Sequence, residues 1–414
     1  MRASPLDAVR TQFGGFRAVF AIPAFATFQA GNFLMTTGFW MQRIAVGWVT
    51  WELTKSEYWL GLVAFAELFP SIITAVYGGA LVDRHPATRI MFWGQIASAA
   101  VASIMAFLSV AGLLTELWIV VVMVLLGAVS GLVLPARLVM ASHLAPKELL
   151  PQAIAVNSTG FNLARFIGPM LAAGLLVAGS ASIVFFVAAL GFLVLAFALY
   201  RIRNVPPQTR RISNRTISTW SVLKEMPQVP VIACVILIQA AQGLFLRPAS
   251  ELFPAFSELV FDLGADGLGF MNAALGIGAI IGALALSKQR ENADALGQIL
   301  LMSSLFAITL LAFSVTSVFW LALVFLVCHG AAMSASNIAA LAYVQIEAPP
   351  ERLGRILSFY TIVFRVGPAT GALIFGITAE ITGLLATGLM FGLVGLFATI
   401  VLGALIFKLS EKTS

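Results

Sequence analysis

Hydrophobic residues are concentrated in twelve long runs, and short polar segments separate them. We place the runs at residues 28–52, 58–80, 88–112, 116–140, 150–178, 181–201, 229–256, 266–288, 295–315, 317–343, 354–381 and 383–408. Runs of about 20 apolar residues have the length that an α-helix needs to cross a ~30 Å hydrocarbon core. The pattern therefore predicts an all-α membrane protein with twelve transmembrane helices.

The amino-acid composition supports a membrane protein and argues against a soluble globular protein. Apolar residues make up 60% of the chain and charged residues only 10%, whereas soluble domains carry roughly 25% charged residues. The net charge of +6 is explained by the membrane topology, so we expect no nucleic-acid partner. The partners we expect are the lipid bilayer, protons and a small-molecule substrate, and we expect the chain to act as a monomer.

Basic residues lie on one side of the membrane in the predicted topology. If the N-terminus is cytoplasmic, the inner segments carry eighteen of the 24 Lys and Arg residues, and the outer loops carry only Lys55. Short cytoplasmic loops are enriched in Lys and Arg. We therefore expect both termini in the cytoplasm of a bacterial cell, with the chain in its plasma (inner) membrane.

The spans divide six and six around a polar, arginine-rich segment. We expect a cytoplasmic leader at 1–27, an N-terminal six-helix bundle at 28–203, a linker at 204–228, a C-terminal bundle at 229–408 and a cytoplasmic tail at 409–414. The halves also repeat each other, because Gly61 and Arg84 recur as Gly267 and Arg290 at an offset of 206. A repeated unit of this kind places the substrate path between the halves, near the membrane midplane.

The loop between the second and third spans reads YGGALVDRHPATR, from Tyr77 to Arg89. Glycines let a neighbouring helix approach closely, and an aspartate can accept hydrogen bonds from the N-terminus of a facing helix. The string resembles the G-x-x-x-D-R-x-G-R-R loop of the major facilitator superfamily, and Gly79, Asp83 and Arg84 match. Pro86 stands in the place of the last glycine, and the two basic places are non-basic. The resemblance implies a clamp that holds two helices in one conformational state.

Three further strings narrow the resemblance. They are GFWMQRIAVGWVTWELTKS, GLVAFAELFP and LPARLVMASHLAPKELLPQAIAVNS, and they resemble the enterobactin-exporter type of twelve-span facilitator, a drug:proton antiporter family. The resemblance implies two pseudo-symmetric six-helix bundles, alternating access and proton-driven efflux without a cofactor. Its members export siderophores, macrolides and other drugs, so no single substrate follows.

Ionisable residues inside the spans are the candidates for function. Such residues cost ~2.5–3.5 kcal/mol on insertion scales and usually face a cavity or a partner. The arginines are Arg43, Arg137, Arg165, Arg247 and Arg365, and the firm acids are Glu67 and Glu251. The excess of positive charge predicts an anionic or carbonyl-rich substrate and disfavours lipophilic cations.

Glu67 is the candidate for proton coupling. It lies three residues before Pro70, and a dry setting favours a protonated carboxyl group whereas a wet one releases the proton. The alternative is a fixed salt bridge to Arg43 or another arginine. Glu251 stands four residues after Arg247, a spacing that favours pairing within one helix.

The remaining candidates lie near helix-bending strings. Arg165 and Arg365 precede two Gly-Pro pairs, Gly168–Pro169 and Gly367–Pro368. The two arginines either attract an anion or bind the cytoplasmic gate and backbone carbonyls. For Arg137, which follows Pro135, a gate-side salt bridge is the preferred interpretation.

His329 and Trp40 complete the set of candidates. His329 lies in the middle of a span, where it is either a proton relay or, more commonly, hydrogen-bonded to a neighbouring helix. Trp40 is a candidate for the cavity wall.

Enzyme functions find no support in the sequence. It has no G-x-x-x-x-G-K-[ST] phosphate loop, no nucleophile with a matching base, and no cluster of His, Cys, Asp and Glu with metal-ligand spacing. We expect a secondary transporter that exports an amphipathic small molecule. The alternatives are an importer or lipid flippase of the same fold, and a membrane receptor or assembly protein that does not transport.

Overall fold

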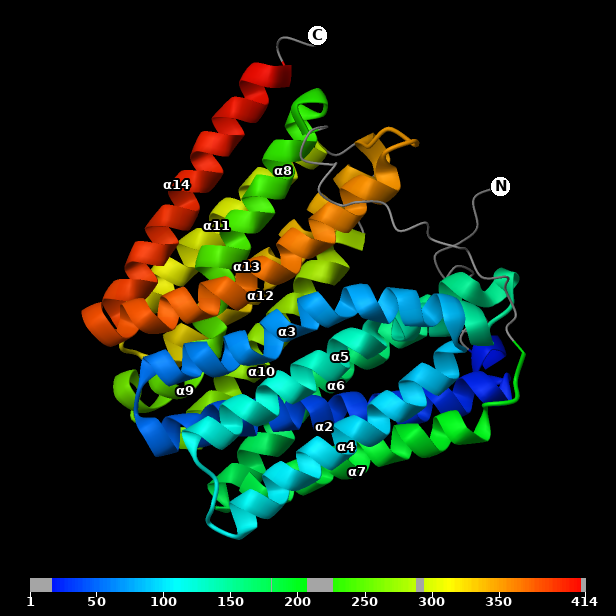
Figure 1. Ribbon diagram of the computed structural model, residues 1–414. Coiled ribbons are helices and arrows are strands. Elements are labelled where there is room, and N and C mark those ends of the chain that lie inside the picture. The colour runs from blue at the N-terminus through cyan, green and yellow to red at the C-terminus, as the bar shows by residue number, and fades with distance from the viewer. Residues whose placement is uncertain (1–16, 180, 207–225, 288–293, 411–414) are drawn as a thin grey trace. The chain divides into compact units, whose positions relative to one another are not determined.

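The computed structural model describes residues 17–179, 181–206, 226–287 and 294–410, and these residues form helices joined by short turns (Figure 1). The first half contains α2 (Pro23–Thr54), α3 (Glu57–Arg84), α4 (Ala87–Val110), α5 (Glu116–Leu144), η1 (Lys147–Leu149), α6 (Leu150–Val177) and α7 (Ala181–Arg201). The second half contains η3 (Met226–Gln228), α8 (Pro230–Ala241), η4 (Gln242–Leu246), η5 (Arg247–Leu252), α9 (Phe253–Ala255), η6 (Phe256–Val260), α10 (Gly264–Ser287), α11 (Ala295–Val315), α12 (Phe319–Glu347), α13 (Leu353–Thr382) and α14 (Leu384–Ser410).

Within the described residues, 11 helical segments are long and apolar enough to cross a membrane. The helix α2 has 32 residues and occupies the first predicted span, but it falls outside this group. Its polar side chains explain why, since Gln29, Asn32, Gln42 and Arg43 all lie along it. The prediction of an all-α membrane protein is confirmed.

The seventh predicted span is not a uniform α-helix. After α8 the chain winds through a π-helix at η4, a 3₁₀ helix at η5 and a second π-helix at η6. Pro248 and Pro254 both lie in this stretch. Proline has no backbone N–H and clashes with the carbonyl four residues earlier, so each of the two weakens α-helical bonding in this stretch.

Contacts divide the described chain into two compact units. The first unit comprises Met1–Val46 and Pro70–Asn214, and the second comprises Gly47–Phe69 and Arg215–Ser414, each only as far as its residues are described. The helices α2 and α3 therefore each contribute residues to both units, and the boundary in α3 falls at Pro70. Most of the leader, the linker and the tail lie outside the described residues, so the division into two bundles at residues 204–228 stays a prediction.

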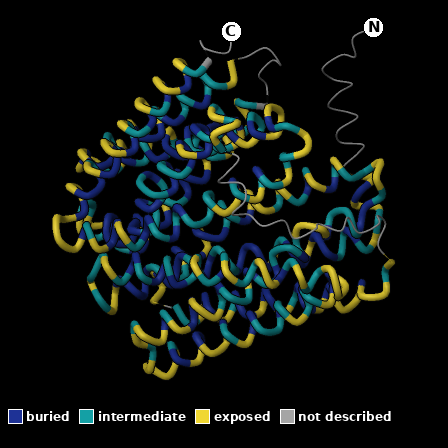
Figure 2. Tube along the Cα trace, turned by 45° about the horizontal axis from the view of Figure 1, so that its top comes forward, coloured by how far each residue is buried: buried dark blue, intermediate teal, exposed yellow. Residues whose placement is uncertain are grey.

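Small residues bring the helices of each unit close together. In the first unit α4 packs against α7 and α5, and a Cβ atom on Gly38 of α2 would lie 3.1 Å from the Ala188 backbone of α7. In the second unit α10 packs against α12, where Gly278 and Gly330 leave room only for hydrogen atoms at the contact. Without a hydrophobic drive between helices in lipid, such close contact stabilises their association. Figure 2 shows buried and exposed positions alternating along the helices.

Candidate transport site

In the first unit, Arg137 of α5 is surrounded by neutral polar groups of α2. Its Nη2 donates to Thr36 Oγ1 at 2.8 Å and to Asn32 Oδ1 at 3.1 Å. Asn32 in turn donates to Asn157 Oδ1 of α6 at 3.1 Å, which joins three helices. Among the described residues, Arg137 has no carboxylate partner, so the preferred salt bridge does not appear here. The positive charge is held by neutral acceptors.

A second group in the first unit brings three of the sequence candidates together. The guanidinium carbon of Arg165 lies 5.3 Å from the centre of the Trp40 ring, and that of Arg43 lies 6.0 Å from it. Phe161 meets the same indole edge to face, with ring centres 6.1 Å apart. A Cβ atom on Gly168 would lie 2.7 Å from Trp40 Cβ, so this glycine allows α6 to approach α2.

In the second unit, Arg247 contacts both neutral amides and an aromatic ring. It donates to Asn337 Oδ1 of α12 and to Gln239 Oε1 of α8, and its guanidinium carbon lies 4.1 Å from the centre of the Phe364 ring of α13. Arg247 and Glu251 both lie in η5, a 3₁₀ helix, and their pairing stays a prediction.

The two units contain the same cation–π contact with its partners exchanged. Trp40 and Arg247 stand 207 positions apart, and Arg165 and Phe364 stand 199 apart. In the first unit the aromatic ring therefore comes from the first span and the arginine from the fifth. In the second unit the arginine comes from the seventh span and the ring from the eleventh.

A neutral hydrogen-bond network lies next to Arg247. Gln242 Nε2 donates to Ser303 Oγ at 2.7 Å and to Ser336 Oγ at 2.9 Å, and Gln239 Nε2 also reaches Ser336 Oγ at 3.2 Å. All four side chains are buried. Because polar groups in the bilayer interior need partners, this network lets α8, η4, α11 and α12 pack together.

His329 lies two turns before Ser336 on the same face of α12 and is also buried. Its Nδ1 lies 3.0 Å from Thr309 Oγ1 and 3.1 Å from the Phe306 carbonyl oxygen, both on α11. This geometry agrees with the interpretation that the imidazole is hydrogen-bonded to a neighbouring helix.

The remaining charged candidates differ in their surroundings. Arg365 of α13 is half-buried, and among the described residues its side chain has no hydrogen-bond or ion-pair partner. Glu67 is half-buried in α3, one turn before Pro70. Gly367, which follows Arg365 at the Gly-Pro pair, packs against Gly243 of η4, and Pro368 lies inside the continuous helix α13. Pro169 lies inside α6 in the same way.

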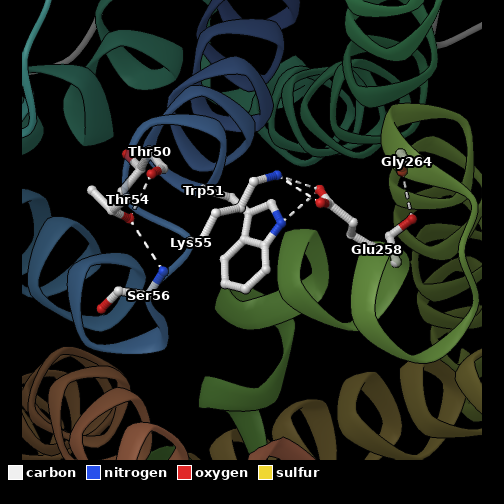
Figure 3. Close-up of polar contacts among 8 residues, drawn as sticks. Thr50, Trp51, Thr54, Lys55, Ser56, Glu258 and Gly264 are labelled. Atoms are coloured by element: carbon white, nitrogen blue, oxygen red, sulfur yellow. Dashed lines mark hydrogen bonds and ion pairs between the residues drawn. The ribbon is translucent and has the colours of Figure 1, made fainter.

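The sequence candidates did not include Glu258 of the second unit, which binds Lys55 and Trp51 (Figure 3). Both oxygens of Glu258 accept from Lys55 Nζ, at 2.6 and 2.8 Å, and one of them also accepts from Trp51 Nε1 at 2.8 Å. Lys55 has a φ of 47°, a left-handed conformation that costs a non-glycine residue roughly 1–2 kcal/mol. Just after Lys55, Ser56 Oγ donates to Glu380 of α13 at 2.8 Å, and the Tyr58 amide donates to the same carboxylate at 3.1 Å.

The loop between α3 and α4 is helical as far as Arg84, and Asp83 and Arg84 are both exposed. The close approach predicted for both glycines is found at Gly78, where an added Cβ atom would lie 2.5 Å from the Leu132 carbonyl oxygen. At Gly79 such an atom would meet open space.

The sequence candidates were chosen for their charge, so the neutral side chains that bind the arginines were missed. Asn32, Asn157, Gln239 and Asn337 are amides inside apolar spans, and that feature could have identified them. Glu258 carried a weaker signal, as an acid near the outer end of a predicted span.

Comparison with known proteins places the chain in a family. A family model described as "Transmembrane secretion effector" matches residues 15–414. The chain is 23% identical over 397 residues to the staphyloferrin A transporter of Staphylococcus aureus, which covers 93% of this chain and 97% of that protein. It is 27% identical over 396 residues to the enterobactin exporter EntS of Salmonella typhi, covering 92% and 93% of the two chains.

Solved structures show the same fold. A bacterial homologue of the human lysosomal transporter Spinster, in an inward-facing and unoccupied conformation, has a TM-score of 0.72 at 16% identity and covers 93% of this chain and 98% of its own. The D-xylose–proton symporter has a TM-score of 0.71 at 13% identity, covering 91% and 96%. The predicted major facilitator fold is confirmed, and the chain is an integral membrane transporter rather than an enzyme. It belongs to the transmembrane secretion effector family of the major facilitator superfamily.

Proposed function

We propose that this protein is a proton-driven exporter of an anionic, siderophore-like small molecule. The observation that carries the proposal is the setting of Arg137, whose charge is held by Asn32 and Thr36 and by no carboxylate among the described residues. Arginine stays protonated at physiological pH, and an uncompensated charge in a span is costly. An anionic substrate supplies the missing negative charge.

Two further findings support an anionic substrate. The half-buried guanidinium of Arg365 has no hydrogen-bond or ion-pair partner in the described part of the chain, so its donors are available to a ligand. The relatives named above are, by name, a staphyloferrin A transporter and an enterobactin exporter. Both names refer to siderophores, which favours this substrate class over a lipophilic cation.

Aromatic and amide groups next to the arginines suit such a substrate. Trp40 and Phe364 each form a cation–π contact with an arginine, and the amides of Asn32 and Asn337 accept hydrogen bonds from arginines. Oxygen-rich ligands with planar groups can bind such surfaces through charge-assisted hydrogen bonds and stacking.

We assign the proton to Glu67. This carboxyl group is half-buried and lies one helical turn before Pro70, where α3 leaves the second unit and enters the first. A change of environment at that turn alters the solvation of the carboxyl group, which shifts the balance between its protonated and ionised forms. Protonation from outside and release inside then drive alternating access in the export direction.

The loop residues Asp83 and Arg84 are proposed to hold one state of this cycle. Both are exposed at the end of α3, and a carboxylate at this place can accept hydrogen bonds from the N-terminus of a facing helix. The proposal places the protein as a monomer in the bacterial inner membrane with both termini in the cytoplasm, as the distribution of basic residues predicts.

The test is export of a defined panel by cells that lack their own pumps. The panel contains carboxylate, catecholate and hydroxamate siderophores, among them enterobactin and staphyloferrin A, with ethidium as the lipophilic cation. We expect cells expressing the protein to release at least one siderophore faster than cells expressing Arg137→Met, and to retain ethidium. Export of ethidium alone would contradict the anionic assignment, and uptake of a siderophore would contradict the direction.

A further inference from the structure

A cavity with basic walls lies at one end of the first unit, next to the loop that carries Asp83 and Arg84. Its volume is about 320 Å³, and the start of α4 and the end of α7 form its walls. These two helices pack side by side (Figure 1). The described residues that line it are Pro86, Thr88, Arg89, Phe92, Leu199, Tyr200, Arg203 and Asn204, and none of them is acidic.

The donors of this cavity are preorganised. Arg203 Nη1 donates to the Tyr200 carbonyl oxygen at 2.8 Å, and its guanidinium lies 3.8 Å from the centre of the Tyr200 ring. The contact fixes the plane of the group and leaves most of its five N–H donors available. Arg89, from the first turn of α4, supplies the second guanidinium.

Two other groups point to an anion in the same place. The helix α4 starts after Pro86 without a side-chain cap and without an acid in its first turn, so its first amides and its dipole are open to negative charge. Thr88 is only 4% exposed and lines the cavity, and among the described residues its hydroxyl has no hydrogen-bond partner. No Asp or Glu occurs anywhere in α4 or α7.

An apolar groove adjoins the cavity and shares Arg89 with it. The groove has a volume of about 390 Å³, and its walls include Ile90, Trp93, Gly94 and Val133. Trp93 is 60% exposed beside it. A ligand with its anionic group at Arg89 and Arg203 therefore has an apolar surface for a hydrocarbon chain directly alongside.

We propose that the end of α4 and α7 forms a binding site for an anionic phospholipid, with the phosphate between Arg89, Arg203 and the start of α4 and an acyl chain over Trp93. Basic pockets between transmembrane helices at the membrane surface suit such head groups. The adjoining groove favours a lipid over free phosphate, because free phosphate has no apolar part that could bind an apolar wall. The site is independent of the transported substrate, because none of the arginines assigned to the substrate lines either space.

The test measures quenching of tryptophan fluorescence in the purified full-length protein in detergent. Phosphatidylglycerol and phosphatidylcholine, each with brominated acyl chains, are titrated separately, and Trp93→Phe reports how much of the quenching arises at the groove. The charge variant is Arg89→Gln/Arg203→Gln. The matched control is Lys147→Gln/Lys408→Gln, which removes two exposed positive charges elsewhere.

We expect half-maximal quenching by phosphatidylglycerol at a concentration about tenfold or more below that of phosphatidylcholine. Trp93→Phe should lose most of the difference in quenching between the two lipids, the charge variant should lose the preference, and the lysine control should keep it. Equal quenching by the two lipids in the wild type overturns the proposal, as does a preference that survives in the charge variant. Displacement of phosphatidylglycerol by millimolar inorganic phosphate would assign the site to a soluble anion instead. If the charge variant does not fold, the wild-type and Trp93→Phe titrations still decide.

Discussion

The substitution Arg137→Met tests the substrate assignment through one side chain. It removes two hydrogen bonds from a charged donor, to Asn32 and Thr36, each worth about 1.5–3 kcal/mol. It also removes a charge from a span, which recovers about 2.5–3.5 kcal/mol on insertion scales. The two effects partly cancel, so we expect the free energy of unfolding to fall by at most about 3.5 kcal/mol.

Binding of an anion should respond far more strongly than folding. A ligand that loses one charge-assisted contact of about 1.5–3 kcal/mol should bind roughly 10- to 150-fold more weakly, since 1.4 kcal/mol corresponds to a factor of ten. The methionine keeps an unbranched side chain of similar length, so a packing defect should contribute little.

The assay is equilibrium binding of the exported siderophore to purified protein, with thermal unfolding of the same samples. Lys408→Met is the matched control, because it removes an exposed positive charge at the end of α14. If Arg137→Met folds and binds the siderophore within about threefold of wild type, the guanidinium does not contact the anion. If it fails to fold, the argument that the two energetic effects partly cancel is wrong.

Four further outcomes follow from the structure. Glu67→Gln should bind substrate and exchange it across the membrane, yet lose accumulation driven by a pH gradient, and uphill transport with unchanged pH dependence would make Glu67 structural only. Asp83→Asn should insert normally but transport slowly, and normal export would refute the clamp. Gly78→Ala should lower the free energy of unfolding by about 1–3 kcal/mol because its Cβ meets the neighbouring backbone. Gly79→Ala should raise it by up to about 1 kcal/mol, because a Cβ atom at that position meets open space. Equal effects of the two variants in thermal unfolding would contradict this. Lys55→Gly should unfold at a higher temperature than Lys55→Gln because glycine relieves the positive φ, and the reverse order would show that the turn is unstrained.

The spans could be predicted from the sequence because the bilayer interior places the same requirement on the backbone of every segment that crosses it. Each backbone polar group must be satisfied within the helix, so long apolar runs can only be helices. The sequence predicted a span at residues 229–256 but not the change from α-helix to π- and 3₁₀-helix after α8. Pro248 and Pro254 weaken α-helical bonding in this span, but Pro169 and Pro368 lie inside continuous α-helices. The winding after α8 therefore also depends on packing, here against α13 and α14.

The candidate site was predictable in its charges and not in their partners. The Arg165–Trp40 contact joins two residues that the sequence had singled out. Asn32 and Gln239 stand out in sequence as amides inside spans, but the sequence does not show which arginine each of them contacts. Lys55 and Glu258 are separated by 203 positions, and no local pattern relates residues at that distance.

The measurement closest to the central claim is transport by the purified protein in liposomes with an imposed pH gradient. We expect the siderophore to accumulate against its own gradient in the more acidic compartment, because an antiporter moves its substrate opposite to the proton. A protonophore should abolish that accumulation, and protein-free liposomes should show none. Movement only down the siderophore's own gradient, or accumulation in the alkaline compartment, would contradict proton-driven export.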